Sequence, residues 1–332
     1  MVIIPKVRLE EIDPALGTGV HPAFIVDGRE ISHFLVAKYE AATYAGGVIS
    51  MPGMDPHNLV DMETARDLSA RKGQGWHLMT NAEWSVLALH AWKTGSLPRG
   101  NTIGGRAHDA PTEEAEITPD KENEYGVSTP RTLTGTGPDT WNHDGTPFGV
   151  SDVVGNVWEW MAGVRLLDGE IQIIPNNDAA LGGVSAWGSG FWRAILPDGS
   201  FVDPGTPGSL KFDSVAPGES GDLGPARIAT ELDNFSQRKS GEDALVSGPY
   251  QAIYSDVPDF NEQMLQALTL FPPAKTGLGD NVGAWARPYG ERGLLRCGDY
   301  LHAHSCGIFC MNLNYDHTAI GPHIGFRFAY LP

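Results

Sequence analysis

The sequence predicts an α+β fold with long irregular loops and two main helices. Of its 332 residues, 41 are Gly and 24 are Pro, so turns and irregular segments should outweigh long helices. Helical spacing of apolar residues is confined to two stretches in the first third of the chain. The hydrophobic content of 41% suffices for a substantial core. No stretch has the composition of a linker between domains, so we expect one domain over residues 1–332 with insertions.

Both helices carry their own start signals. The first is expected at residues 61–73, where Asp61 is placed to cap the free backbone amides. The second is expected at residues 80–95, because Thr80 and Glu83 have the T-x-x-E spacing of a capping box. Short strands with glycine turns are expected to follow the second helix.

Two strands are expected before these helices, at residues 23–26 and 34–40. Asp27 and Gly28 lie between them and have the residue types of a tight turn, so we expect the two strands to form a hairpin around this pair.

The string "GNVWEW" at residues 155–160 combines a tight turn with a strand. Side chains alternate between the two faces of a strand, so Trp158 and Trp160 should share one face and Glu159 should point to the other. This pattern is typical of a core strand as much as of a functional site.

The closing stretch "IGFRFAYL" is expected to form one buried strand. Ile324, Phe326 and Phe328 alternate on one face, and Arg327 points to the opposite face. A buried guanidinium there requires an acidic or carbonyl partner, and Gly325 allows another backbone to approach closely.

The charge and the termini exclude several classes of protein. A formal net charge of −18 argues against binding nucleic acid through its phosphates. The first residues are apolar for only four positions, which does not resemble a signal peptide, and no apolar run is long enough to cross a bilayer. We therefore expect no nucleic-acid partner and no membrane insertion.

Cysteines occur only near the carboxyl terminus, at Cys297, Cys306 and Cys310. An odd number of cysteines, three in so long a chain, does not indicate a fold held together by disulfides. His302 and His304 lie beside Cys306, but their spacing matches no common zinc pattern. We interpret this stretch as a loop of contact residues.

Four strings together carry a family resemblance. Residues 34–43, "GWHLMTNAEWSVLA", "GNVWEW" and "IGFRFA" occur in the order seen in the formylglycine-generating-enzyme type of C-type lectin fold. The chain resembles that superfamily over nearly its whole length. In calcium-binding relatives the Asn and Glu of the "GNVWEW" type of motif help to hold the ion, so the resemblance implies that Asn156 and Glu159 bind calcium here. Their side-chain oxygens are ligands that suit this metal. In the alternative interpretation, Asn156 only closes a turn and Glu159 pairs with an arginine. No cofactor is required in either case.

The resemblance does not extend to the enzymes' catalytic cysteines. Aligning "RCGDYLHAHSCG" through Arg296 and Gly298 places His302 and Gly307 where the copper-binding Cys pair belongs, and Cys306 is one position off. Fold alone does not assign function. We therefore expect no enzyme. An oxidase of the formylglycine-generating class and a calcium-dependent carbohydrate-binding lectin remain the alternatives.

The segment at residues 297–323 resembles the variable region of proteins that are diversified by retroelements through adenine mutagenesis, as in phage and prophage tails. An AAC codon altered at its adenines never yields Lys, Glu, Gln, Met or Trp, and between Asp299 and His323 only Met311 belongs to that set. Tyr and Asn side chains make adaptable contacts at low entropic cost.

This resemblance implies a variable ligand-binding face that is exposed to solvent. Its partner would be a protein or glycan receptor on a host cell, and the protein would act on a virion tail or cell surface, as a homo-oligomer or within a tail fibre. The face would comprise Asp299, Tyr300, Leu301, His302, His304, Phe309, Asn312, Asn314, Tyr315, Asp316, His317, Ala319, Ile320, Pro322 and His323.

Overall fold

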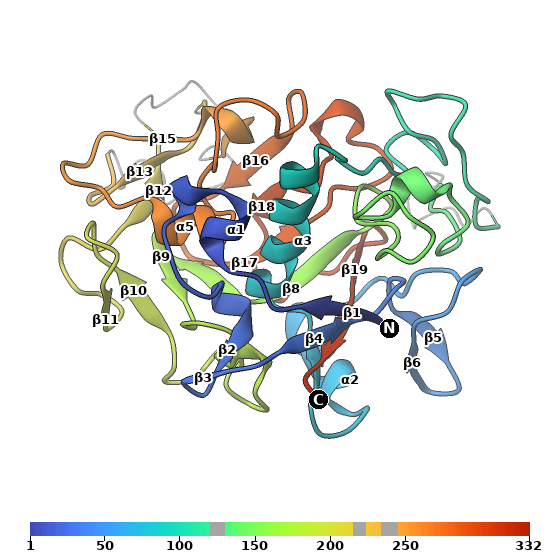
Figure 1. The fold of residues 1–332 in the computed structure, drawn as a ribbon, viewed down its shortest axis with the longest axis horizontal. Helices are drawn as coiled ribbons and strands as arrows, with labels where there is room; N and C mark the ends of the chain where they lie inside the picture. Colours follow the sequence, from blue (N-terminus) through green and yellow to red (C-terminus); the bar gives the residue numbers. More distant parts are fainter. Residues whose placement is uncertain (120–129, 215–223, 234–244) are drawn as a thin grey trace.

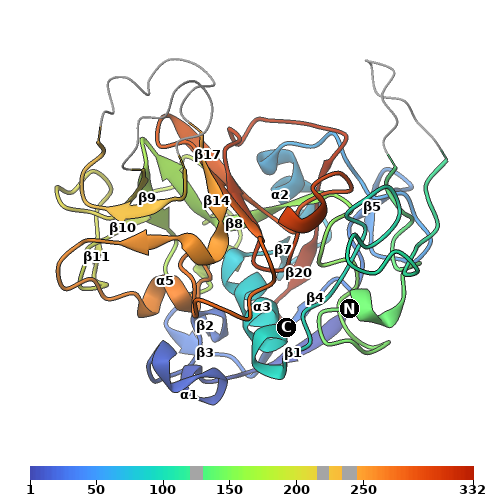
Figure 2. The ribbon, with the colours of Figure 1, turned by 90° about the horizontal axis from the view of Figure 1, so that it is seen from above.

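Two β-sheets and two main helices build the fold, which confirms the α+β class. The computed structural model describes residues 1–119, 130–214, 224–233 and 245–332. Figure 1 shows the helix α3 crossing the middle of the molecule, with both chain ends at the smaller sheet. Figure 2 shows most strands of the larger sheet on one side of α3 and the hairpin that contains β5 on the other.

The smaller sheet has four strands in the order β1-β4-β20-β7. These are β1 (Val2–Pro5), β4 (His33–Val36), β20 (Phe328–Tyr330) and β7 (Trp76–Leu78). Two hairpins stand apart from it, β2 (Ile25–Val26) with β3 (Arg29–Glu30), and β5 (Ala42–Tyr44) with β6 (Gly47–Ile49).

Among the described residues the larger sheet has twelve strands, and it contains the last three residues of the "GNVWEW" string. Its main path runs through β14 (Val246–Pro249), β16 (Gly283–Ala286), β18 (Met311–Leu313), β17 (Glu291–Arg296), β8 (Trp158–Leu167), β9 (Glu170–Ile173), β12 (Lys211–Asp213), β13 (Arg227–Ala229) and β15 (Tyr254–Ser255). Off this path lie β10 (Arg193–Ile195), β11 (Phe201–Val202) and β19 (Ile324–Phe326). The long strands β8 and β17 form its centre.

Both expected helices are confirmed, with the caps that the sequence indicates. In α2 (Met62–Ala70) the Asp61 carboxylate accepts from the backbone N–H of Thr64 at 2.8 Å. In α3 (Asn81–Thr94) Thr80 and Glu83 form the capping box. The other helices of the described residues are short, α1 (Leu9–Ile12) and α5 (Gln263–Ala267).

The expected first hairpin is wrong in its extent. Asp27 and Gly28 do form a turn, but it joins only β2 and β3, and β4 is a separate strand of another sheet. The cause lies upstream, where Pro22 starts a short 3₁₀ turn and the His21 ring accepts from the backbone N–H of Ala23 at 3.1 Å. This turn occupies the residues that would have lengthened β2.

The closing segment is two strands instead of one. β19 pairs with β8 in the larger sheet, while β20 lies between β4 and β7 in the smaller sheet. The chain changes sheet at Arg327. The close approach expected at Gly325 is confirmed, because a side chain there would lie 2.5 Å from the carbonyl oxygen of His57.

The buried side chain of Arg327 explains why the chain changes sheet at this point. Its Nη2 donates to Oε1 of Glu159 at 2.8 Å and its Nε donates to Oε2 at 3.1 Å. Its other N–H groups donate to the backbone carbonyls of Ala37, Lys38 and Ser151. The acidic and carbonyl partners expected from the sequence are therefore both confirmed, and one guanidinium connects the two sheets.

Two more carboxylates, Glu40 and Asp152, are buried beside this ion pair. Glu40 accepts from the Asn156 amide at 2.7 Å through Oε2, and its Oε1 has no hydrogen-bond partner among the described residues. Burial, and then the charges of Asp152 and Glu159, raise the pKa of Glu40 well above its usual range. Burial also raises the pKa of Asp152 to about 6. Three carboxylates thus face one guanidinium, and folding favours the neutral forms of Glu40 and Asp152.

Replacing Glu40 with Gln should raise the melting temperature near neutral pH and change it little at acidic pH. A carboxyl with a higher pKa in the folded state stabilises the fold below its unfolded pKa, and this contribution is lost as the pH rises through the folded pKa. For Asp152 this stability is lost as the pH rises from 3.8, the ordinary pKa of the carboxyl, to about 6, its pKa in the fold. Asp152→Asn should therefore also raise the melting temperature above that pH range. Thermal unfolding followed by circular dichroism across this range measures both effects.

Glu159→Gln is the matched control from the same cluster. It removes the carboxylate that accepts two hydrogen bonds from the buried Arg327 guanidinium, which should cost about 3–5 kcal/mol. A Glu40→Gln variant that loses as much stability near neutral pH would show that Glu40 is ionised and paired, contrary to this account.

Candidate ligand-binding face

The tryptophans of the sheet lie beneath the carboxyl-terminal segment at residues 297–323. The ring of Trp158 meets that of Trp285 edge-on, with centroids 5.8 Å apart. The His302 ring contacts both, at 5.5 Å from Trp158 and 5.7 Å from Trp285. Its Nδ1 lies 2.6 Å from Oδ1 of Asp299. His302 is therefore held by two aromatic rings and one carboxylate.

The "GNVWEW" string forms backbone hydrogen bonds with both ends of this segment. At the start, the backbone N–H of Gly155 donates to the Cys297 carbonyl at 3.0 Å, and that of Tyr300 donates to the Asn156 carbonyl at 3.2 Å. At the end, the N–H of Trp158 donates to the His323 carbonyl at 2.8 Å. The segment therefore leaves and rejoins the sheet at one point, and β18 lies between its two ends.

Asn156 shapes the turn in this string. Its backbone has a positive φ of 61°, a conformation that Asn tolerates better than most residues. Its Oδ1 accepts from the backbone N–H of Thr132 at 2.8 Å and from the Asn101 amide at 3.2 Å. Its amide donates to Glu40. These bonds join three loops that lie far apart in the sequence.

The alternative interpretation of Asn156 and Glu159 describes the contacts in this structure, since Asn156 closes a turn and Glu159 pairs with Arg327. No group of three or more His, Cys, Asp or Glu side chains within the described ranges is placed to hold a metal ion. Calcium at Asn156 and Glu159 stays a prediction.

The residues assigned to the face differ widely in exposure. Leu301, His304 and Ile320 are exposed; His302, Asn314, Tyr315, Asp316, His317, Ala319, Pro322 and His323 are half-buried; Asp299, Tyr300, Phe309 and Asn312 are buried. The expectation that all of them face solvent is therefore wrong for the last four.

Each of these four is buried for a local reason. The Asp299 carboxylate accepts from the backbone N–H of Leu301 at 2.8 Å, and the carbonyl of Tyr300 accepts from Gly104 at 3.0 Å. The ring of Phe309 stacks on Tyr250, with centroids 5.6 Å apart. Asn312 lies in β18, between β16 and β17.

The sequence interpretation missed two tryptophans that complete the face. Trp285 lies on β16 and packs on His302, as described above. Trp187 lies between β9 and β10, and its ring stacks on His317 with centroids 4.1 Å apart and planes 9° apart. Its indole N–H donates to Glu291 at 2.8 Å. The sequence offered one indication of a role for Trp187, which is that a large aromatic residue stands in a glycine-rich stretch.

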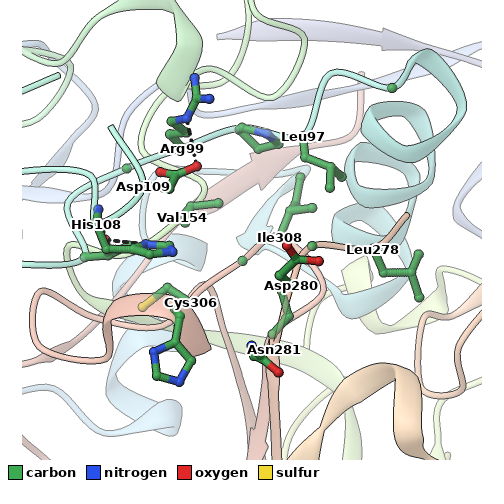
Figure 3. Close-up of a pocket in the computed structure, with 18 residues that line it drawn as sticks. Leu97, Arg99, His108, Asp109, Val154, Leu278, Asp280, Asn281, Cys306 and Ile308 are labelled. Carbon is green, nitrogen blue, oxygen red and sulfur yellow. Dashed lines mark hydrogen bonds and ion pairs between the residues drawn. The ribbon is translucent and has the colours of Figure 1, made fainter. Parts of the chain in front are cut away.

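A cavity of about 370 Å³ opens beside this face (Figure 3). Apolar side chains from four parts of the chain line it, Leu97, Val154, Leu278 and Ile308. The segment contributes His304, Cys306, Gly307 and Ile308. The rest of its lining lies outside residues 297–323, so a ligand bound here would contact residues that the sequence interpretation had not assigned to the face.

Charged groups also line this cavity. Arg99 donates to Asp109 at 3.0 Å and to Glu113 at 3.1 Å, and Figure 3 shows the first of these contacts. Asp280 and Asn281 are exposed at the opposite side. The cavity therefore combines apolar walls with polar groups, a combination found in many binding sites.

All three cysteines are buried free thiols. Burial raises the pKa of Cys297, Cys306 and Cys310, so the reactive thiolate is disfavoured at neutral pH. The thiol of Cys306 donates to the Asp299 carbonyl at 3.2 Å and that of Cys297 to the Gly155 carbonyl at 2.8 Å. Two of these thiols therefore help to hold the start of the segment.

Compared with known proteins, the chain matches no family model and no curated sequence. Among the described residues, no helix has the length and apolar character needed to cross a membrane.

Single alanine substitutions should separate the two kinds of position in the segment. Leu301 is 63% exposed, so Leu301→Ala should change the free energy of unfolding by no more than about 0.5 kcal/mol. Phe309 is fully buried, so Phe309→Ala should cost about 3–5 kcal/mol. Urea titration of both variants provides the measurement. Equal losses would mean that the exposed and the buried positions of the segment are not distinct.

Proposed function

We propose that this chain is a ligand-binding display protein with a C-type lectin fold of the formylglycine-generating-enzyme type. Residues 297–323 form its variable region, and a retroelement diversifies that region. The observation that carries the proposal is the way the segment is held. Both its ends are bonded to the "GNVWEW" string, while Leu301, His304 and Ile320 lie exposed between those ends. Such an arrangement allows side chains to change while the frame stays the same.

The residue types in the segment support the same proposal. Met311 is the one residue between Asp299 and His323 that adenine mutagenesis of an AAC codon could not produce. Its side chain is fully buried in β18. A position at the centre of a sheet has to stay apolar, so a fixed residue is expected there.

The proposed partner is a protein or glycan receptor on a host cell, contacted from a phage tail or a cell surface. Half-buried Tyr315 and His302 offer rings with polar atoms, and exposed Leu301 and Ile320 offer apolar contacts. Large side chains of this kind supply most of the affinity in protein interfaces. Assembly as a homo-oligomer or within a tail fibre belongs to the same proposal.

The two alternatives receive less support. An oxidase of the formylglycine-generating class needs a reactive thiol pair, whereas burial raises the pKa of every thiol here. A calcium-dependent lectin needs free oxygen ligands, whereas both Glu159 oxygens accept from Arg327. Both arguments favour a binding function that uses neither group.

The experiment is to sequence the DNA around the gene. The proposal expects a near-copy of the last coding stretch that differs at adenines, beside a reverse-transcriptase gene. Among sibling copies of the gene, substitutions should gather at exposed and half-buried positions such as Leu301, His304 and Ile320, and should be absent from Ile308 and Leu313. Absence of both the near-copy and this pattern would refute the proposal.

A further inference from the structure

Two arginines lie beside the candidate face, outside the lining of the cavity. Arg287 is two residues beyond Trp285, and its backbone N–H donates to the Leu313 carbonyl at 3.1 Å. Because Pro288 follows, Arg287 favours an extended conformation, and alternation then places its side chain on the same face as Trp285. Arg292 reaches this area from β17, where its Nη1 donates to the Asn314 carbonyl at 3.4 Å.

Within the described ranges, no carboxylate lies within ion-pair distance of either arginine. Arg287 is half-buried, and its Nε is shielded from solvent and has no acceptor in the part of the chain that the structure describes. The Nε of Arg292 donates to the Tyr289 carbonyl at 3.0 Å, and its guanidinium lies 4.7 Å from the centre of the Tyr289 ring. Burial lowers the pKa of Arg292, and so does the positive charge of Arg287. The negative charges of Asp316 and Asp168 raise it. The two cations are therefore close enough to repel each other.

The neighbouring carboxylates already have other partners. Asp299 binds His302, and Asp316 accepts from the backbone N–H and the hydroxyl of Thr318 at 2.9 and 2.8 Å. Glu291 accepts from Trp187. In a chain with 41 acidic and 23 basic side chains, these two arginines form no ion pair with a carboxylate of the described residues.

An acceptor without a partner lies on the chain segment that pairs with the segment of Arg287. Arg287 directly follows β16 and Asn314 directly follows β18, two parallel strands that pair Ala286 with Leu313. The Oδ1 of Asn314 is buried without a donor among the described residues. Buried polar atoms without partners are destabilising. A bound group that both accepts from Arg287 and donates to Asn314 would satisfy both atoms.

We propose that Arg287 and Arg292 bind a carboxylate group of the ligand, and that Asn314 accepts a hydrogen bond from a donor beside that carboxylate. A guanidinium binds a carboxylate through two parallel hydrogen bonds, which gives orientation as well as affinity. An N–H or O–H group near that carboxylate would donate to Asn314. An acidic side chain of a partner protein and an acidic sugar both present this chemistry. This proposal rests on the proposed function, because it treats the face that carries Trp285 as the ligand-binding face.

Two pairs of small probes test the proposal without a host receptor. The first pair is N-acetyl-glutamate N-methylamide and its glutamine counterpart. The second is N-acetylneuraminic acid and its methyl ester. Binding is followed by NMR through the indole N–H signal of Trp285, which is present in the parent and in every variant. The carboxylate member of at least one pair should bind about tenfold more tightly than its neutral counterpart, as expected for a charge-assisted hydrogen bond. The pair that shows the preference identifies an acidic protein or an acidic sugar as the source.

Arg287→Gln should abolish that preference, and Arg29→Gln is the matched control. Arg29 is exposed in the β2–β3 hairpin, so the control removes the same charge without touching the face. Unfolding curves establish that both variants fold.

Equal binding of the charged and neutral probes would overturn the proposal, as would a preference that survives Arg287→Gln. Tighter binding of inorganic phosphate than of either carboxylate would also overturn it. The proposed function is tested separately by the DNA around the gene, so either can fail while the other stands.

Discussion

The buried ion pair between Arg327 and Glu159 is the interaction on which the rest of the structure depends. It joins the residue where the chain leaves the larger sheet to the strand that carries the "GNVWEW" string. A buried pair of this kind adds little net stability compared with apolar packing, but losing one partner is costly because the other charge stays buried. The pair therefore specifies where the closing strand lies. Glu40 and Asp152 beside it make the centre of the protein sensitive to protonation.

The position of the closing strand decides the geometry of the proposed face. β19 pairs with β8 in parallel, so the His323 carbonyl receives the N–H of Trp158. The same turn receives the start of the segment through Gly155 and Asn156. Because one string holds both ends, the loop is closed by backbone bonds and needs few particular side chains at its exposed positions. This is the physical property that a diversified binding surface requires.

Local features of the fold could be predicted from the sequence, because they depend on residues close together in the chain. The caps at Asp61 and Thr80 are of this kind, and so is the need of Arg327 for an acidic partner. The split of the closing segment into β19 and β20 could not be predicted, since a single alternation of apolar residues fits one long strand equally well. Its cause is a guanidinium that requires carbonyls from loops hundreds of residues away.

The candidate site shows the same division. The segment at residues 297–323 could be located from its residue types, but the burial of Tyr300 and Asn312 could not, because Tyr and Asn occur on surfaces and in interiors alike. Trp285 and Arg287 reach the face through a parallel pairing of β16 with β18 that no short sequence pattern predicts. Sequence reasoning thus found the loop and missed the sheet beneath it.

The central claim is that the frame folds independently of the side chains it displays, and a saturation scan of residues 297–323 with a protease-resistance readout tests it most directly. The account predicts that Leu301, His304 and Ile320 accept nearly every residue, while Ile308, Met311 and Leu313 accept only apolar ones of similar size. If the exposed positions prove as intolerant as the buried ones, folding depends on the displayed side chains and the claim is contradicted.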